Sequence, residues 1–110
     1  MTQAEFLNQK VFTGLMNHNN TKDHTDFTLS EEDFATVLVK AEYYGIAIYE
    51  IKTTLDGKHY KTINHESFRK KATDADWYKK EFKHLKRLEE GLLYTATYKV
   101  SKKLLNKNSV

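Results

Sequence analysis

Apolar residues recur at three- and four-residue spacing between Ser30 and Gly45, and at two-residue spacing directly after Gly45. The first spacing predicts a helix with one apolar stripe, made by Phe34, Val37, Leu38, Ala41 and Tyr44. Ser30 followed three residues later by Asp33 is typical of a helix N-cap, and Gly45 can adopt the left-handed conformation that ends a helix. We therefore expect a helix that begins at Ser30 and ends at Gly45, with a positive φ at Gly45.

The residues after Gly45 predict a β-hairpin. Alternation places Ala47, Tyr49, Ile51, Thr53 and Leu55 on one face of a strand, and Asp56-Gly57 favours a two-residue type I′ turn. This short loop pairs Thr53 with Tyr60 and Ile51 with Thr62, whereas a three-residue loop would set Ile51 opposite Lys61. We therefore expect the shorter loop. We also expect the face with Tyr49, Ile51 and Tyr60 to pack against the stripe of Phe34, Leu38 and Ala41.

The other face of this hairpin is predicted to be basic. The shorter loop sets Lys52 opposite Lys61, with His59 one pair away, and like charges that face each other destabilise a sheet. An anionic partner would relieve this repulsion. The alternative is a solvated face on which the long lysine side chains splay apart, with Glu50 diagonal to Lys61.

The N-terminal segment, from Thr2 to about Asn17, also has helical spacing. Thr2 with Glu5 makes a capping box, and Leu7, Val11 and Leu15 share one face. Polar residues from Asn17 to Thr28 then predict a surface loop. It contains His18, Asp23, His24 and Asp26, but no histidine pair four residues apart and no calcium-loop spacing fixes a coordination geometry, so we expect no metal site.

A third helix is predicted from the capping pattern of Thr73 with Asp76 to a C-cap at Gly91. Its apolar residues Tyr78, Phe82, Leu85 and Leu88 fall within one arc, and Lys79, Lys80, Lys83, Lys86 and Arg87 project from the opposite side. The alternation from Leu92 to Ser101 favours a third strand after Gly91. The alternative is a single helix from Asp74 to about Leu105 that contains Gly91, because the leucines in this region also keep helical spacing.

The length of the chain indicates one domain, residues 1–110, and the predicted helices and strands indicate a helix-rich α+β fold. Cysteine is absent, which excludes a thiol nucleophile and a cysteine-based zinc site and is typical of a reducing cytoplasm. The four glycines are too scattered for a phosphate loop, and neighbouring acids such as Glu31-Glu32 do not face each other on a helix. We therefore expect a cytoplasmic protein that is not an enzyme, binds no cofactor and does not cross a membrane.

Charge is distributed unevenly along the chain. The first 50 residues carry three lysines and eight acids, a net −5, whereas residues 51–110 carry fifteen basic residues and seven acids, a net +8. Such an asymmetry suggests a polyanion-binding end, or two halves that attract each other within one chain or between copies of a homo-oligomer.

The stretches VLVKAEYYGIAIYEI, DGKHYKTI and FKHLKRLEEGLLYTATYKV resemble the way in which winged-helix domains end a helix at glycine and enter the strands of the wing. The resemblance covers Ser30 to Ile63 and implies the order helix, helix, strand, strand, helix, strand. It also implies a helix in the DNA major groove beside a wing hairpin, or a module that binds only protein. This chain differs from that pattern in the acids at Glu31, Glu32 and Asp33 and in the loop that precedes them.

Two functions remain. The first is binding of nucleic acid, with DNA preferred, through phosphate contacts. The residues predicted to make these contacts are Lys52, His59, Lys61, Arg69, Lys70, Lys71, Lys79, Lys83 and Arg87. The second is a protein-interaction module or inhibitor, which would use the acidic N-terminal half and the surplus aromatic residues.

Overall fold

The computed structural model describes residues 1–19 and 27–107, and these residues form a four-stranded antiparallel sheet in the order β1-β4-β2-β3. The elements are α1 (Gln3–Phe6), the π-helix η1 (Leu7–Val11), β1 (Thr28–Leu29), α2 (Glu31–Tyr44), β2 (Ala47–Leu55), β3 (Lys58–Asn64), the 3-10 helix η2 (His65–Phe68), α3 (Ala75–Leu88), β4 (Leu93–Lys99) and α4 (Lys102–Lys107). The predicted α+β class is confirmed. The structure adds β1, η2 and α4 to the predicted elements, so it does not establish the winged-helix order.

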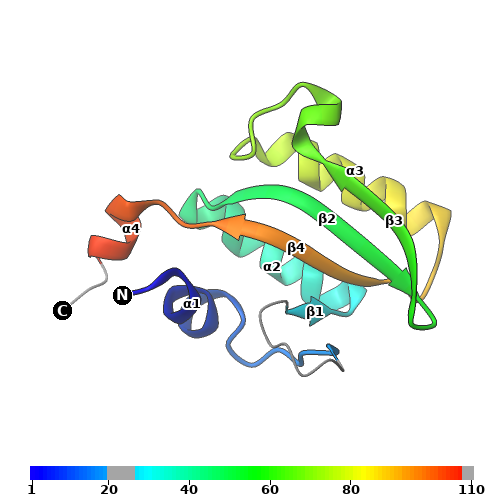
Figure 1. Ribbon diagram of the computed structural model, residues 1–110, viewed down its shortest axis with the longest axis horizontal. Helices are drawn as coiled ribbons and strands as arrows, with labels where there is room; N and C mark the ends of the chain where they lie inside the picture. Colours follow the sequence, from blue (N-terminus) through cyan, green and yellow to red (C-terminus); the bar gives the residue numbers. More distant parts are fainter. Residues whose placement is uncertain (20–26, 108–110) are drawn as a thin grey trace.

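Helices α2 and α3 lie on the same side of the sheet, behind β4, β2 and β3 in Figure 1. Phe34 of α2 stacks on Tyr94 of β4 with ring centroids 4.9 Å apart, and Phe82 of α3 meets both rings edge-on. The core between these layers is apolar except for Thr53, whose side chain is fully buried. Its largest fully buried side chains are Phe6, Val11, Leu29, Phe34, Val37, Ile46, Ile48, Ile51, Tyr78, Leu85, Leu92 and Tyr94.

The local signals around α2 act as predicted. The Ser30 hydroxyl accepts a hydrogen bond from the Asp33 backbone N–H at 3.3 Å, which caps the first turn. Gly45 has φ 68° and ends the helix, while the Ile46 backbone N–H donates to the Ala41 carbonyl. The predicted bounds and the predicted positive φ are both confirmed.

The hairpin turn is confirmed but its predicted register is wrong. Leu55 pairs with Lys58, and Asp56 and Gly57 both have positive φ, as a type I′ turn requires. The register then shifts between Thr53 and Thr54, so that Tyr60 is an extra residue in β3. In the observed register Thr53 pairs with Lys61, Lys52 with Thr62, and Ile51 with Ile63. Lys52 therefore does not face Lys61, and the predicted repulsion across the hairpin is absent.

The predicted inner face of the hairpin is correct only in part. Ile51 is buried, but Tyr49 and Tyr60 are each 36% exposed, and Ile48, which was predicted on the opposite face, is fully buried. The pairing of β2 with β4 shifts register between Ile48 and Glu50, and this irregularity puts Ile48 and Ile51 on the same side of the sheet. Strict alternation therefore holds only from Ile51 onward.

The N-terminal helix is shorter than predicted. The capping box of Thr2 and Glu5 is confirmed, but α1 continues as η1 and ends at Val11 rather than near Asn17. The wider π-helical turn, closed by a hydrogen bond from the Phe12 N–H to the Leu7 carbonyl, brings both Val11 and Phe12 into the core. Thr28, the predicted end of the loop, is the first residue of β1.

The side chain of Gln3 attaches α1 to the sheet. Its amide donates to the Tyr98 carbonyl at 3.0 Å, and its Oε1 accepts from the Val100 N–H at 2.9 Å. Within the described residues, β1 pairs only with Tyr94 and Thr95 of β4, so Gln3 supplies hydrogen-bond partners for the Tyr98 carbonyl and the Val100 N–H beyond the end of β1.

The ends of α3 also differ from the prediction. Asp74, not Thr73, caps the helix by accepting from the Asp76 N–H, and the C-cap is Glu89 rather than Gly91. Gly91, with φ 79°, lies in the turn that leads to β4. β4 confirms the predicted third strand, and the alternative of one continuous helix through Gly91 is wrong.

Gly45→Ala should lower the free energy of unfolding by about 1 kcal/mol. A Cβ at this position would meet no atom within 4 Å, so the cost comes from the backbone at φ 68° alone. Urea unfolding measures the change. Gly45→Asn is the control and should cost less, because asparagine tolerates the left-handed region. Equal stability of the alanine variant and the wild type would contradict the assigned cap.

Tyr94→Phe should stabilise the protein at alkaline pH. Burial, reinforced by Glu31, raises the pKa of Tyr94 to about 12, and its hydroxyl has no hydrogen-bond partner among the described residues. Because the folded pKa lies above the ordinary value of 10, the proton of Tyr94 stabilises the fold below pH 10, and this stabilisation is lost as pH rises through about 12.

Urea unfolding at neutral pH and at two pH values between 10 and about 12 tests this. The phenylalanine variant should match or exceed the wild type at neutral pH, by up to about 1 kcal/mol, and should lose less stability above pH 10. Tyr43→Phe is the control, since Tyr43 is 81% exposed. A loss above about 1 kcal/mol at neutral pH would mean that the hydroxyl has a partner.

Candidate nucleic-acid interface

The nine residues predicted to bind phosphate are divided between two surfaces. Lys52 pairs with Thr62 and Thr95, while the neighbouring residues Ile51 and Thr53 are buried on the helix side. Side chains alternate along a strand, so Lys52 lies on the sheet face that α2 and α3 leave open. His59 belongs to this open face too, because its Nε2 is 2.6 Å from the Thr62 hydroxyl.

The open face is polar and has one ion pair that involves Lys52. Its ammonium lies 3.9 Å from a carboxylate oxygen of Glu50 in the same strand. The Thr28 and Thr95 hydroxyls are 2.8 Å apart on the neighbouring strands. Lys61, in contrast, pairs with the inward-facing Thr53 and therefore points toward the side of α3, exposed at the edge of the sheet.

The other predicted residues surround η2 and α3. Asn64 caps η2 by accepting from the Ser67 N–H at 3.1 Å, and the turn closes with hydrogen bonds from the Arg69 and Lys70 N–H groups to the Glu66 and His65 carbonyls. The turn forces Arg69 into the left-handed region, with φ 54°. That conformation normally favours glycine or asparagine, so a long charged residue there costs backbone energy.

Phe68 and Trp77 form the aromatic centre of this region. Phe68 is 38% exposed, whereas Trp77 is 2% exposed, and the rings are nearly parallel with centroids 6.1 Å apart. The ring of His65 lies on another side of the indole, with centroids 6.4 Å apart, and its Nδ1 is 2.7 Å from the Lys70 carbonyl. Trp77 Nε1 is buried without a partner among the described residues. Ring contacts, rather than a hydrogen bond, therefore hold the indole in place.

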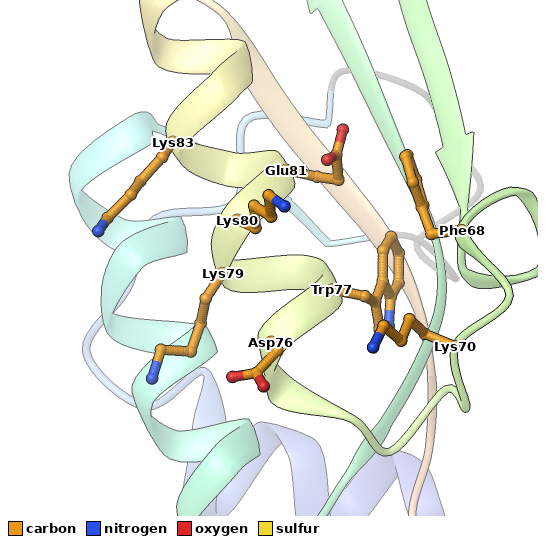
Figure 2. Close-up of a pocket in the computed structure, with 8 residues that line it drawn as sticks. All are labelled: Phe68, Lys70, Asp76, Trp77, Lys79, Lys80, Glu81 and Lys83. Atoms are coloured by element: carbon orange, nitrogen blue, oxygen red, sulfur yellow. The ribbon is translucent and has the colours of Figure 1, made fainter.

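These aromatics lie in an open depression between η2 and α3, which we call the aromatic-basic groove. Two adjoining hollows of about 630 and 430 Å³ make it up, and both are lined by Phe68, Lys80, Glu81 and Lys83. The first also contains Lys70, Asp76, Trp77 and Lys79, and the second His84 and Arg87. Figure 2 shows Phe68, Trp77 and Lys70 on one side of α3 and Lys79 and Lys83 projecting from the other, with Lys80 between them.

Most cations of the groove lack a carboxylate partner. Within residues 1–19 and 27–107, Lys79 is the α3 cation that forms a salt bridge, 3.2 Å from Glu42. Lys86 instead lies over the Phe82 ring, 4.6 Å from its centroid. Lys80, Lys83 and Arg87 are exposed and unpaired in the described structure. They span about 10 Å of helix axis at 1.5 Å per residue.

The sequence prediction of binding residues did not include Phe68 or Trp77. Trp77 precedes the apolar arc of the third helix by one residue, and Phe68 stands alone in a polar connection, so neither belongs to a periodic pattern. An isolated aromatic residue directly before Arg69-Lys70-Lys71 was the available signal.

A second, smaller groove of about 220 Å³ separates α2 from α3. Its apolar wall consists of Ala35, Leu38, Val39 and Phe82, and its rim of Glu42, Lys79, Lys83 and Lys86. Val39 is 68% exposed, and Tyr43, one turn further along α2, is 81% exposed. This largely apolar groove adjoins the basic face of α3.

The described residues contain neither a metal-ligand cluster nor a membrane-spanning helix. The part of the chain that the structure describes contains no group of three or more His, Asp or Glu side chains arranged to hold a metal ion. Asp23, His24 and Asp26, considered above as ligands, lie outside the described residues. Among residues 1–19 and 27–107, no helix is long and apolar enough to cross a membrane.

Comparisons with protein-family models, with curated proteins and with solved structures find no match for this chain. Function must therefore be inferred from the geometry and charge of the two grooves.

Arg69→Gly should raise the free energy of unfolding by about 0.5 kcal/mol. Glycine adopts φ 54° without steric cost, and this gain should exceed the added entropy of the unfolded chain. Urea unfolding measures the change. Lys70→Gly is the matched control, because Lys70 has no positive φ, and it should be neutral or destabilising. A loss of stability in Arg69→Gly would show that the arginine side chain stabilises the turn.

Proposed function

We propose that this protein binds nucleic acid, with DNA as the first candidate, through the aromatic-basic groove and the outer face of α3. The supporting observation is the row of exposed Lys80, Lys83 and Arg87, which lack carboxylate partners among the described residues. Unpaired cations side by side on a rigid helix repel one another, and a phosphate backbone relieves that repulsion and releases its own counterions.

α3, rather than α2, is the helix that we assign to nucleic acid. A winged-helix arrangement would place the helix from Ser30 to Gly45 on DNA. That helix begins with Glu31, Glu32 and Asp33, and the ammonium of Lys40 is hydrogen-bonded to the Val11 carbonyl at 3.2 Å. α3 has the opposite character, since it ends in Lys86 and Arg87. The likeness to winged-helix domains therefore stays a proposal about the fold and does not determine the binding helix.

The predicted residues contribute to this proposal unequally. Lys70, Lys79, Lys83 and Arg87 line the aromatic-basic groove, Arg69 and Lys71 flank it in sequence, and Lys61 points to the same side of the sheet. Lys52 and His59 belong to the open face. If one strand of nucleic acid follows α3, Lys52 and His59 make no contact with it, and their replacement measures whether the open face binds separately.

The double variant Lys80→Ala/Lys83→Ala should weaken binding to every oligonucleotide sequence alike. Each lost phosphate contact should reduce the slope of log K against log salt by about 0.7 for a single strand and about 0.9 for a duplex. Fluorescence anisotropy over a salt series beginning at about 50 mM measures both quantities, because phosphate-driven binding is strongest when counterions are scarce. Stability should change by no more than about 0.5 kcal/mol, since these side chains are exposed.

Lys102→Ala/Lys103→Ala is the matched control. It removes the same charge from exposed positions in α4, which Figure 1 places beyond the end of the sheet, away from η2 and the C-terminal end of α3. The control should change affinity only through net charge. Equal losses in the two double variants would indicate non-specific attraction, and no binding by the wild type at about 50 mM salt would reject the proposed function.

The second candidate is a protein-interaction module that uses the groove between α2 and α3. Exposed Val39 and Tyr43 support it, because large apolar side chains on a helix surface are typical of contact sites. The lysine-rich rim fits a partner helix that carries both leucine-like and carboxylate side chains. A labelled acidic amphipathic peptide is the probe, and Val39→Glu should abolish its binding without affecting oligonucleotides. An unchanged affinity for the peptide would reject this candidate.

A further inference from the structure

We infer that Phe68 is a stacking platform for an unpaired nucleobase, so that the aromatic-basic groove takes single-stranded rather than double-stranded nucleic acid. This inference rests on the proposed function and specifies the form of its ligand. It depends on three features: the exposure of the Phe68 ring, its contact with the buried ring of Trp77, and the cations on both sides.

The Phe68 ring is exposed although the aromatic ring next to it is buried. Its side chain is 38% exposed at the end of η2, while the larger Trp77 beside it is 2% exposed. The hydrogen bonds that close η2 fix the backbone on both sides of Phe68, and Arg69 carries the strained φ of 54° that the turn demands. The chain therefore holds an apolar ring at the surface on a rigid turn.

Trp77 lies next to Phe68 and fixes its surroundings, with ring centroids 6.1 Å apart. The rings are inclined by only 22°, and Trp77 is itself packed against His65 and Tyr78. An exposed ring held beside a packed aromatic neighbour can accept a base at little entropic cost, because the platform is already ordered.

Cations flank the platform on both sides. Lys70 follows it in the same turn, and Lys80 and Arg87 line the groove along α3. The acids Asp76 and Glu81 also line the groove, so its charge is mixed near the helix start and basic toward the C-terminal end. Proteins that bind single strands combine these two features, an aromatic ring for the base and a basic track for the backbone.

A duplex can make fewer of these contacts than a single strand. Its bases already stack on one another and leave no free face for Phe68, so a duplex could use only the phosphate contacts of α3. The groove should therefore prefer a single strand, and the preference should depend on Phe68.

The test compares three labelled probes: a thymidine 15-mer, a duplex of the same length, and an abasic 15-mer that has the phosphates without bases. Phe68→Ala should weaken binding of the thymidine oligomer about 5- to 150-fold, with an unchanged salt slope, and should leave the abasic oligomer unaffected. Phe68→Trp should restore binding. Far-UV circular dichroism checks that each variant is folded, because both substitutions change the surroundings of Trp77, whose ring centroid lies 6.1 Å from that of Phe68.

The outcomes separate this inference from the proposed function. If Phe68→Ala binds the thymidine oligomer as the wild type does, or loses equal affinity for all three probes, the stacking role is wrong while phosphate binding stands. Tighter binding of the duplex than of the single strand by the wild type also overturns it. If none of the probes binds at about 50 mM salt, both proposals fail together.

Discussion

The structure depends on three aromatic rings, one from each element that must meet in the core. Phe34 of α2 stacks on Tyr94 of β4, and Phe82 of α3 meets these rings edge-on at 5.4 and 5.2 Å. Pairs of this geometry contribute about 0.5–1.5 kcal/mol beyond the burial of their area. Because Tyr94 contacts both helices, α2 and α3 are attached to the sheet at the same point. This contact fixes which face of α3 is turned toward the sheet.

That placement creates the candidate site. With Tyr78, Phe82 and Leu85 buried against the sheet, the lysines and Arg87 of α3 must face solvent, since a helix presents its opposite faces to opposite sides. Trp77 lies in the first turn, at the margin of the core. η2 brings Phe68 and His65 against its indole, which is 2% exposed. The exposed phenylalanine and the basic helix face are thus neighbours because the core ends at Trp77.

Sequence reasoning was most accurate where the signal is local. Ser30, Gly45 and Asp56-Gly57 each act through their own backbone geometry, so the bounds of α2 and the hairpin turn agree with the prediction. The pairing of the strands was less predictable, because nothing in the alternation of apolar and polar residues along the sequence marks where a bulge adds an extra residue. Tyr60 in β3 and the irregularity near Tyr49 in β2 each change which side chains face the helices.

The sequence by itself determined the bounds of α2, the hairpin turn at Asp56-Gly57, the basic character of α3 and the absence of cysteine chemistry, because these depend on neighbouring residues or on composition. Only the tertiary structure decided that Lys52 and His59 lie apart from the α3 lysines, since that depends on which sheet face the helices cover. It also decided that Phe68 lies against Trp77. Those two residues are nine positions apart and belong to different elements, and the contact arises because the turn after β3 returns the chain to the first turn of α3.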